Sequence, residues 1–144
     1  MIIPDTNLLI YAYDSDSKQH DASRAWLEDC LNGEETVGLP WVVVCAFIRI
    51  STNRAAVRSA FSADEAADIV QSWLDQPVVR LISSGEDFSQ HFLRLIRELG
   101  TAGNLTTDAQ IAAHAIENQA TVYSNDSEFD RFPGLRWRNP IKSA

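Results

Sequence analysis

Short apolar segments that alternate with helical segments are the feature of this sequence that most constrains its fold. Because two parallel strands must be joined by a crossover, usually a helix, such alternation is typical of an α/β layered fold around a mostly parallel sheet. The strands are expected at residues 1–4, 36–39, 78–82, 121–124 and 135–138, with a polar turn at 125–130.

Helices are expected between these strands, and several carry clear start or stop signals. Pro40 suits the first position of a helix, Ser62-Ala63-Asp64-Glu65 is a capping box, and Ser84 can cap the next helix. Asn32-Gly33 and Gly100 are stop signals. The predicted helices span residues 8–12, 18–31, 40–52, 62–75, 86–99 and 107–118.

Length and composition predict one domain spanning residues 1–144. Apolar residues make up 45% of the chain, which is enough for a continuous core. The two cysteines, Cys30 and Cys45, lack C-x-x-C spacing, so we expect reduced thiols and a cytoplasmic location. We expect neither a signal peptide nor a membrane helix, because no apolar run approaches the roughly 18 residues that span a bilayer.

The charge is negative overall but unevenly distributed. The formal net charge is −8, whereas residues 36–63 contain three arginines and no acid, and residues 131–144 contain four basic residues and no acid. An acidic protein does not attract nucleic acid through its overall field. If nucleic acid is the substrate, a bound cation and local arginines must make the electrostatic potential positive where the nucleic acid docks.

Three aspartates are the leading candidates for chemistry. Asp5 and Asp126 follow predicted strands, and the carboxyl ends of parallel strands form the usual ligand crevice. Asp108 begins a helix whose alanines permit close packing on the sheet. Carboxylates gathered in one crevice suit Mg²⁺ or Mn²⁺, which can activate water and stabilise charge on a phosphoryl group.

Each aspartate also has a structural interpretation. Asp5 and Asp108 are well suited to cap helices, and Asp126 is well suited to stabilise a turn. Other chemistries have less support, since the histidines lack paired metal-ligand spacing and the glycines form no nucleotide-binding loop. Trp26 and Trp73 occur at helical spacing and are expected in the core.

Four segments together resemble one known family. They are Ile3-Pro4-Asp5-Thr6-Asn7-Leu8-Leu9-Ile10-Tyr11-Ala12, Leu39-Pro40-Trp41 through Ala46-Phe47-Ile48-Arg49-Ile50-Ser51-Thr52-Asn53, Gly103-Asn104-Leu105-Thr106-Thr107-Asp108-Ala109-Gln110-Ile111-Ala112-Ala113, and Ser124-Asn125-Asp126-Ser127-Glu128-Phe129-Asp130-Arg131-Phe132. In this order and spacing they resemble the PIN-domain ribonucleases, specifically the VapC toxins of VapBC toxin–antitoxin modules. The likeness spans nearly the whole chain.

The resemblance implies a PIN-like three-layer fold with a central, mostly parallel sheet of four to five strands. It also implies a Mg²⁺- or Mn²⁺-dependent endoribonuclease, usually a homodimer, that is inhibited by a cognate VapB-type antitoxin. Carried over by position, the metal-binding and catalytic acids are Asp5, Asp108 and Asp126. The supporting polar residues are Thr6, Asn7 and Ser124.

The chain departs from the family pattern at Ala46, where many members have a glutamate. Another acid, Asp130 or Glu128, is then a candidate to complete the site. The alternative function is a catalytically weak or inactive PIN-like module that binds an antitoxin or RNA. A phosphatase of the haloacid dehalogenase type is disfavoured, because Asn7 stands where that chemistry needs a second aspartate.

Arginines are the candidates for contacts with substrate phosphates. Arg49 and Arg54 lie in the acid-free segment, and Arg131, Arg136 and Arg138 lie in the basic tail. Their guanidinium groups suit bidentate phosphate contacts. A solvated basic face is the structural alternative for the acid-free segment.

Overall fold

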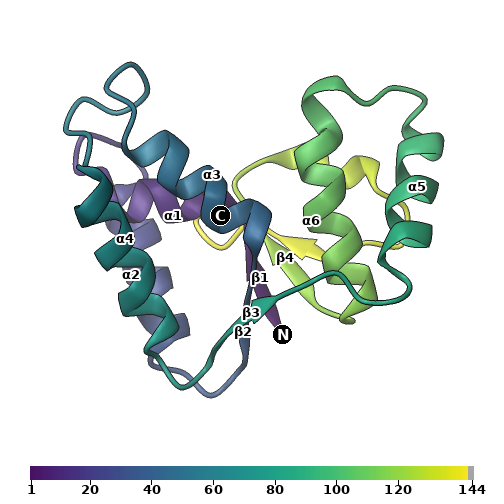
Figure 1. Ribbon diagram of the computed structural model, residues 1–144, viewed down its shortest axis with the longest axis horizontal. Helices are drawn as coiled ribbons and strands as arrows, with labels where there is room; N and C mark the ends of the chain where they lie inside the picture. The colour runs from purple at the N-terminus through teal and green to yellow at the C-terminus, as the bar shows by residue number, and fades with distance from the viewer. Residues whose placement is uncertain (143–144) are drawn as a thin grey trace.

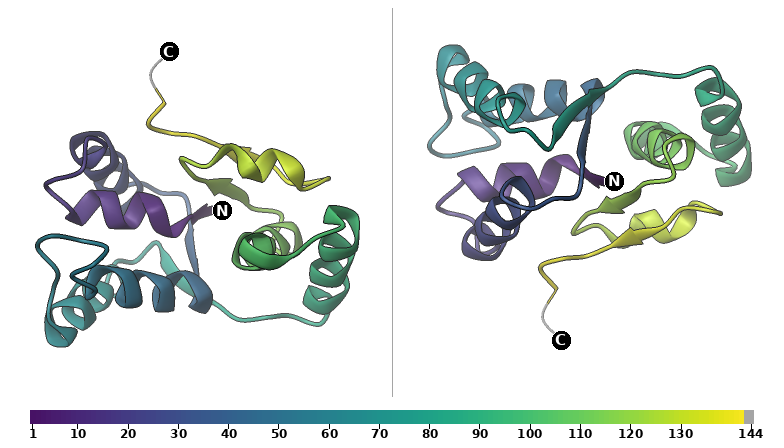
Figure 2. Two further views of the ribbon diagram at one scale, coloured as in Figure 1. Left: turned by 90° about the horizontal axis from the view of Figure 1, so that it is seen from above. Right: turned by 90° about the horizontal axis from the view of Figure 1, so that it is seen from below.

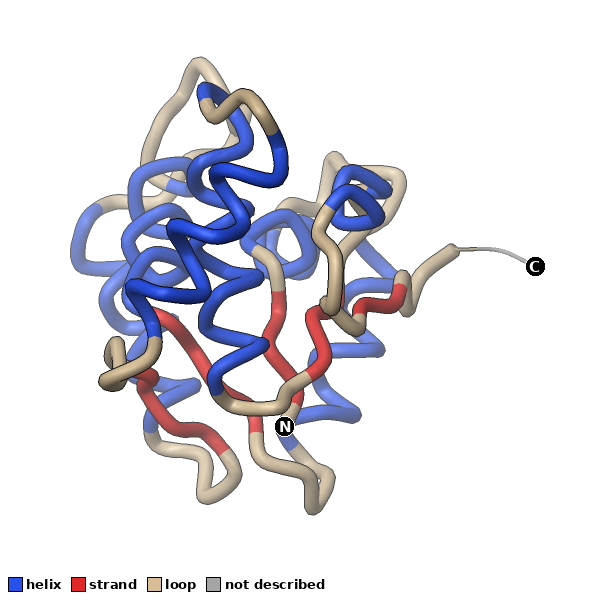
Figure 3. The backbone as a smooth tube through the Cα atoms, turned by 90° about the vertical axis from the view of Figure 1, so that its right-hand side faces the viewer, coloured by secondary structure: helices blue, strands red, loops and turns tan. Residues whose placement is uncertain are grey.

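One parallel sheet of five strands organises the chain. The computed structural model describes residues 1–142, and its strand order is β3-β2-β1-β4-β5 with every pair parallel. The strands are β1 Ile2–Pro4, β2 Val37–Pro40, β3 Val79–Ile82, β4 Thr121–Tyr123 and β5 Trp137–Arg138. Figure 3 shows these short strands side by side, joined by much longer helices. All five predicted strands are confirmed, and all except β2 are shorter than expected.

Helices cover both faces of the sheet. Figures 1 and 2 show α1 to α4 on one side and α5 and α6 on the other, which confirms the predicted three-layer α/β fold. The helices are α1 Thr6–Tyr13, α2 His20–Leu31, α3 Trp41–Ser51, α4 Ala63–Leu74, α5 Phe88–Leu99 and α6 Thr106–Glu117, with 3-10 helices η1 Gly103–Leu105 and η2 Ser127–Arg131. No helix within residues 1–142 is both long and apolar enough to cross a membrane.

Two predicted helix starts are wrong. Pro40 is the last residue of β2 and precedes the first helical residue, Trp41, with an extended backbone. Ser84 does not cap α5, because Glu117 of α6 accepts hydrogen bonds from the backbone N–H groups of Gly85 and Asp87 at 2.9 and 3.1 Å. A Cβ at position 85 would lie 2.5 Å from that carboxylate, so a larger residue there would require the Glu117 side chain to shift.

The capping box is confirmed and the expected polar turn is more regular than predicted. Ser62 and Glu65 exchange side-chain to backbone hydrogen bonds at the start of α4. Gly100 ends α5 with a positive φ of 69°. Residues 127–131 of the polar segment form the 3-10 helix η2, and the Asp126 side chain accepts a hydrogen bond from the N–H of Glu128 at its start.

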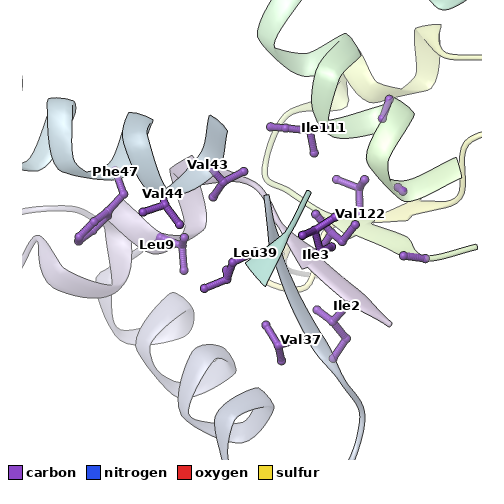
Figure 4. Packing of buried hydrophobic residues seen from close by; sticks show 14 of the residues in the cluster. Ile2, Ile3, Leu9, Val37, Leu39, Val43, Val44, Phe47, Ile111 and Val122 are labelled. Atoms are coloured by element: carbon purple, nitrogen blue, oxygen red, sulfur yellow. The ribbon is translucent and has the colours of Figure 1, made fainter. Parts of the chain in front are cut away.

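The core joins the sheet to the helices on both sides. Ile3 and Val122 lie on adjacent strands, and Leu9, Val44 and Phe47 lie together between α1 and α3 (Figure 4). All five side chains are buried. On the opposite face, α6 packs through four fully buried alanines, Ala109, Ala112, Ala113 and Ala115, as its sequence predicts.

An aromatic cluster stabilises the four-helix side of the sheet. Trp73 of α4 is 1% exposed, and its ring centroid lies 4.7 Å from that of Phe47. The indole Nε1–H donates a 2.9 Å hydrogen bond to the hydroxyl of Tyr13. The predicted core position of Trp73 is confirmed, whereas Trp26 is half-buried and stacks on Tyr123.

Candidate active site

Asp5 lies where the central strand ends and α1 begins. Its backbone N–H donates to the carbonyl of Tyr123 at 2.8 Å, which joins the ends of β1 and β4. One carboxylate oxygen accepts from the N–H of Thr6 at 2.7 Å and the other from the hydroxyl of Ser124 at 2.6 Å. Asp5 therefore does cap α1, and the same contacts fix its carboxylate at the carboxyl edge of the sheet.

Ser124 connects three polar residues of this edge. Its buried hydroxyl donates to Asp5 and accepts from the backbone N–H of Asp126 at 2.9 Å and from the side-chain amide of Asn7 at 3.4 Å. A hydroxyl has one donor and two acceptor sites, so Ser124 uses all of them. The orientation of Asp5 is thus coupled to the backbone that carries Asp126.

A pocket of about 370 Å³ opens at this point. Its lining comes from the end of β1 and from α1, α3, α6 and the segment after β4, and comprises Asp5, Thr6, Asn7, Ile10, Tyr11, Ala46, Arg49, Ile50, Thr107, Asp108 and Asp126. The structure therefore brings together the three predicted carboxylates and the predicted Thr6, Asn7 and Arg49, with Ser124 buried beneath them.

Mutual repulsion and burial disfavour the ionised forms of two carboxylates. Burial raises the pKa of Asp5 above its ordinary value of 3.8, hydrogen bonds from Ser124 and Thr6 oppose that shift, and Asp126 adds to it. Burial, together with repulsion from Asp5, Asp126 and Glu128, raises the pKa of Asp108 to about 7. Asp108 makes no capping bond to α6, so the alternative interpretation of Asp108 as a helix cap is wrong.

The donor set fits a hard divalent cation. Thr6 Oγ1 and Asn7 Oδ1 are buried and have no hydrogen-bond partner among the described residues, and both belong to residues that line the pocket. Within residues 1–142, no group of three or more aspartate, glutamate, histidine or cysteine side chains is placed so that it could hold a metal ion. A Mg²⁺ ion keeps several waters and commonly takes only one or two carboxylates, so it does not need all three aspartates as direct ligands.

Some sequence candidates lie outside the pocket. Asp130 accepts a 2.8 Å hydrogen bond from the indole of Trp137 and lines a separate cavity beside β5. Arg54 is exposed in the loop after α3 and does not line the pocket. Glu128 is close enough to affect Asp108 electrostatically but pairs with Arg131 at 3.2 Å.

Sequence reasoning missed the apolar part of the lining. Ile10 and Tyr11 come from α1, and Ile50 comes from α3, one helical turn after Ala46. The spacing of Ala46 and Ile50 places them on one helix face, but only the packing of α1 beside α3 shows that this face borders the carboxylates.

The raised pKa of Asp108 predicts that the metal-free protein is destabilised by its own site. The folded state binds a proton at Asp108 more tightly than the unfolded chain does. The contribution of this proton to the free energy of unfolding is therefore complete below pH 3.8 and is lost as the pH rises through about 7. We expect Asp108→Asn to raise the melting temperature by a few degrees at pH 8 without divalent cations. Thermal unfolding with EDTA measures this, and an unchanged or lower value would contradict it.

Comparisons with known proteins identify the family. The family model described as PIN domain matches residues 2–135. The chain belongs to the PIN-domain family. Ribonuclease VapC33 of Mycobacterium tuberculosis is 39% identical over 142 residues, covering 99% of both chains, and Ribonuclease VapC37 is 36% identical over 140 residues, covering 97% of both. The resemblance to VapC proteins is therefore confirmed.

Solved structures agree on the PIN fold. The structure of VapBC2 from Rickettsia felis bound to a promoter DNA fragment matches with a TM-score of 0.72 and 23% identity, covering 96% of this chain and 98% of that one. VapC20 of Mycobacterium tuberculosis, a toxin that cleaves the sarcin-ricin loop, matches with a TM-score of 0.66 and 20% identity, covering 94% and 99%. At these identities the likeness establishes the fold.

Proposed function

We propose that this PIN domain is a Mg²⁺- or Mn²⁺-dependent endoribonuclease and the toxin of a type II toxin–antitoxin system. The observation that carries the proposal is the convergence of Asp5, Asp108 and Asp126 on one pocket, in a chain that matches Ribonuclease VapC33 over 99% of its length. The relatives reported above carry ribonuclease names, so the alternative of a module that only binds is not favoured.

The residues of the site have separate tasks in this proposal. Asp5, Asp108 and Asp126 hold the cation, while Ser124, Thr6 and Asn7 hold the polar edge in place. The bound cation would supply an activated water and would neutralise charge on the phosphodiester. One of the carboxylates accepts the proton released when water attacks the phosphorus.

Arg49 is the proposed phosphate contact. It lines the pocket, its side chain is exposed, and it forms no ion pair within residues 1–142. A free guanidinium at the rim of an acidic pocket suits the phosphate group of an incoming RNA. Because Arg54 lies outside the pocket, any contact that it makes is with a more distant part of the RNA backbone.

The proposed partners are a VapB-type antitoxin, an RNA substrate and a second copy of this chain. Two solved structures with the same fold are VapBC assemblies, from Rickettsia felis and Haemophilus influenzae, which supports the antitoxin proposal. We also propose a cytoplasmic location, which suits the free thiols of Cys30 and Cys45.

Metal titration tests the proposed function. We expect calorimetry to detect Mg²⁺ and Mn²⁺ binding to the wild-type protein and much weaker binding to Asp108→Asn. RNA cleavage should stop in EDTA and return when Mg²⁺ or Mn²⁺ is added in excess. Cleavage that persists in EDTA, or metal binding that is unchanged in Asp108→Asn, would contradict the assignment.

A further inference from the structure

The active-site pocket has an apolar wall that the proposed hydrolysis does not use. Ile10 and Tyr11 of α1 and Ala46 and Ile50 of α3 line the same pocket as the three aspartates. This set of four residues is called the apolar wall below. Side chains that hold a cation or move a proton are polar, so the wall has no part in that chemistry and is available to another part of the ligand.

Local geometry explains why the wall borders the carboxylates. Helix α1 starts directly after Asp5, so Ile10 and Tyr11 lie little more than one turn from that carboxylate. On α3, Ala46 and Ile50 are four residues apart and share a face, and Arg49 lies beside them. The wall, Arg49 and the acids therefore line one pocket.

Alanine at position 46 keeps this side of the pocket open and uncharged. Ala46 is only 5% exposed, so a longer side chain there would extend into the pocket or displace its neighbours. The volume of about 370 Å³ lies within the roughly 300–1,000 Å³ of ordinary small-ligand pockets. The opening is therefore large enough for a planar organic group as well as the phosphate.

We propose that the apolar wall holds one unstacked base of the RNA next to the phosphodiester that is cut. This inference rests on the proposed function and adds a substrate preference to it. In RNA, aromatic bases with apolar faces are attached through ribose to charged phosphates, which matches a pocket with Arg49 beside an apolar wall that includes Tyr11. Single-stranded RNA is commonly recognised by stacking its bases on aromatic rings or arginine planes.

Two preferences follow from this arrangement. A base that is paired within a helix cannot reach the wall unless it is unstacked, which costs a few kcal/mol in related base-flipping systems. Single-stranded RNA should therefore be cut faster than the same strand in a duplex. Removing the base next to the cut should slow cleavage, even though the phosphodiester itself is unchanged.

RNA cleavage with and without the base is the direct test. Short homopolymers of A, C, G and U are incubated with the wild-type protein and Mg²⁺, beside an abasic ribose–phosphate oligomer of the same length. We expect kcat/KM for the best homopolymer to exceed that for the abasic oligomer by about 10- to 100-fold, because stacking one base contributes about 1–3 kcal/mol. Equal values would overturn the proposal.

Variants locate the effect at the wall. Ala46→Leu fills the pocket. It should reduce the ratio of kcat/KM for base-containing RNA to kcat/KM for abasic RNA to less than about threefold. Ile50→Ala only removes atoms, so it tests the same wall without overpacking the pocket. It should lower the same ratio of kcat/KM values, but by less than Ala46→Leu does. Ala67→Leu is the matched control, since Ala67 is exposed on α4, and should behave as wild type.

A binding measurement separates this proposal from the proposed function. Fluorescence anisotropy with the Asp5→Asn protein compares the affinities for labelled homopolymers and the abasic oligomer without any cleavage. Tighter binding of base-containing RNA that Ala46→Leu removes supports the wall as a base site, even if the wild-type protein does not cut. Equal affinities would overturn the base site, whether or not metal-dependent cleavage is observed. The wall would then be assigned to contact with a side chain of a partner protein.

Discussion

Replacing Asp5 with asparagine lowers the rate of RNA cleavage by a factor on the order of 10²–10⁴, because a ligand of the proposed cation is lost. The amide has nearly the shape of the carboxylate, and its one oxygen can still accept the hydrogen bond from the N–H of Thr6 that caps α1, whereas its NH2 group cannot accept from the hydroxyl of Ser124. The fold should therefore survive, and circular dichroism spectra of the variant and the wild type should coincide. Cleavage is measured with labelled RNA under saturating Mg²⁺.

Two further variants make the Asp5 result interpretable. Ser124→Ala removes the hydroxyl that orients Asp5 but leaves the carboxylate, so a smaller loss of roughly 10- to 100-fold is expected. Asp68→Asn makes the same chemical change as Asp5→Asn on an exposed part of α4 and should have no effect. Wild-type cleavage by Asp5→Asn would refute the proposed role of this carboxylate.

Replacing Trp73 with alanine lowers the free energy of unfolding by about 3–5 kcal/mol, the range typical of large aromatic deletions in a core. The change leaves a cavity beside Phe47 and removes the hydrogen-bond donor to Tyr13. Since Tyr13 ends α1, the helix that begins at Asp5, the variant should also weaken the support of the site.

Urea unfolding followed by circular dichroism measures this loss. The matched control is Trp41→Ala, because Trp41 is 53% exposed, whereas Trp73 is 1% exposed. We expect the control to change the free energy of unfolding by less than about 1 kcal/mol. Equal destabilisation by the two variants would show that the aromatic cluster is not a major part of the core.

The parts of the fold that follow from local patterns could be predicted from the sequence. The alternation of apolar and helical segments correctly predicts the parallel sheet, and the capping box at Ser62 correctly predicts the start of α4. The start of α5 could not be found in this way. Its preceding loop is held by Glu117, which lies about 30 residues later in the chain and has no local signal that links it to Gly85.

The candidate site shows the same division between local and tertiary information. Asp5 and Asp126 could be placed because the ends of parallel strands meet at one edge. Asp130 was a reasonable substitute for the missing acid by sequence distance, but η2 directs it to Trp137 instead. The apolar wall depends on how α1 packs beside α3, which no spacing within either helix reveals.

Because β1 lies in the middle of the sheet, the time at which its neighbouring strands are synthesised decides when the site can form. The first strand to be synthesised receives its partner β4, and with it Ser124 and Asp126, only when most of the chain has been translated. Before that point, Asp5 lacks both the hydroxyl that orients it and the acids that share its pocket. A nascent chain therefore emerges from the ribosome before Asp5, Asp108 and Asp126 can come together in one pocket.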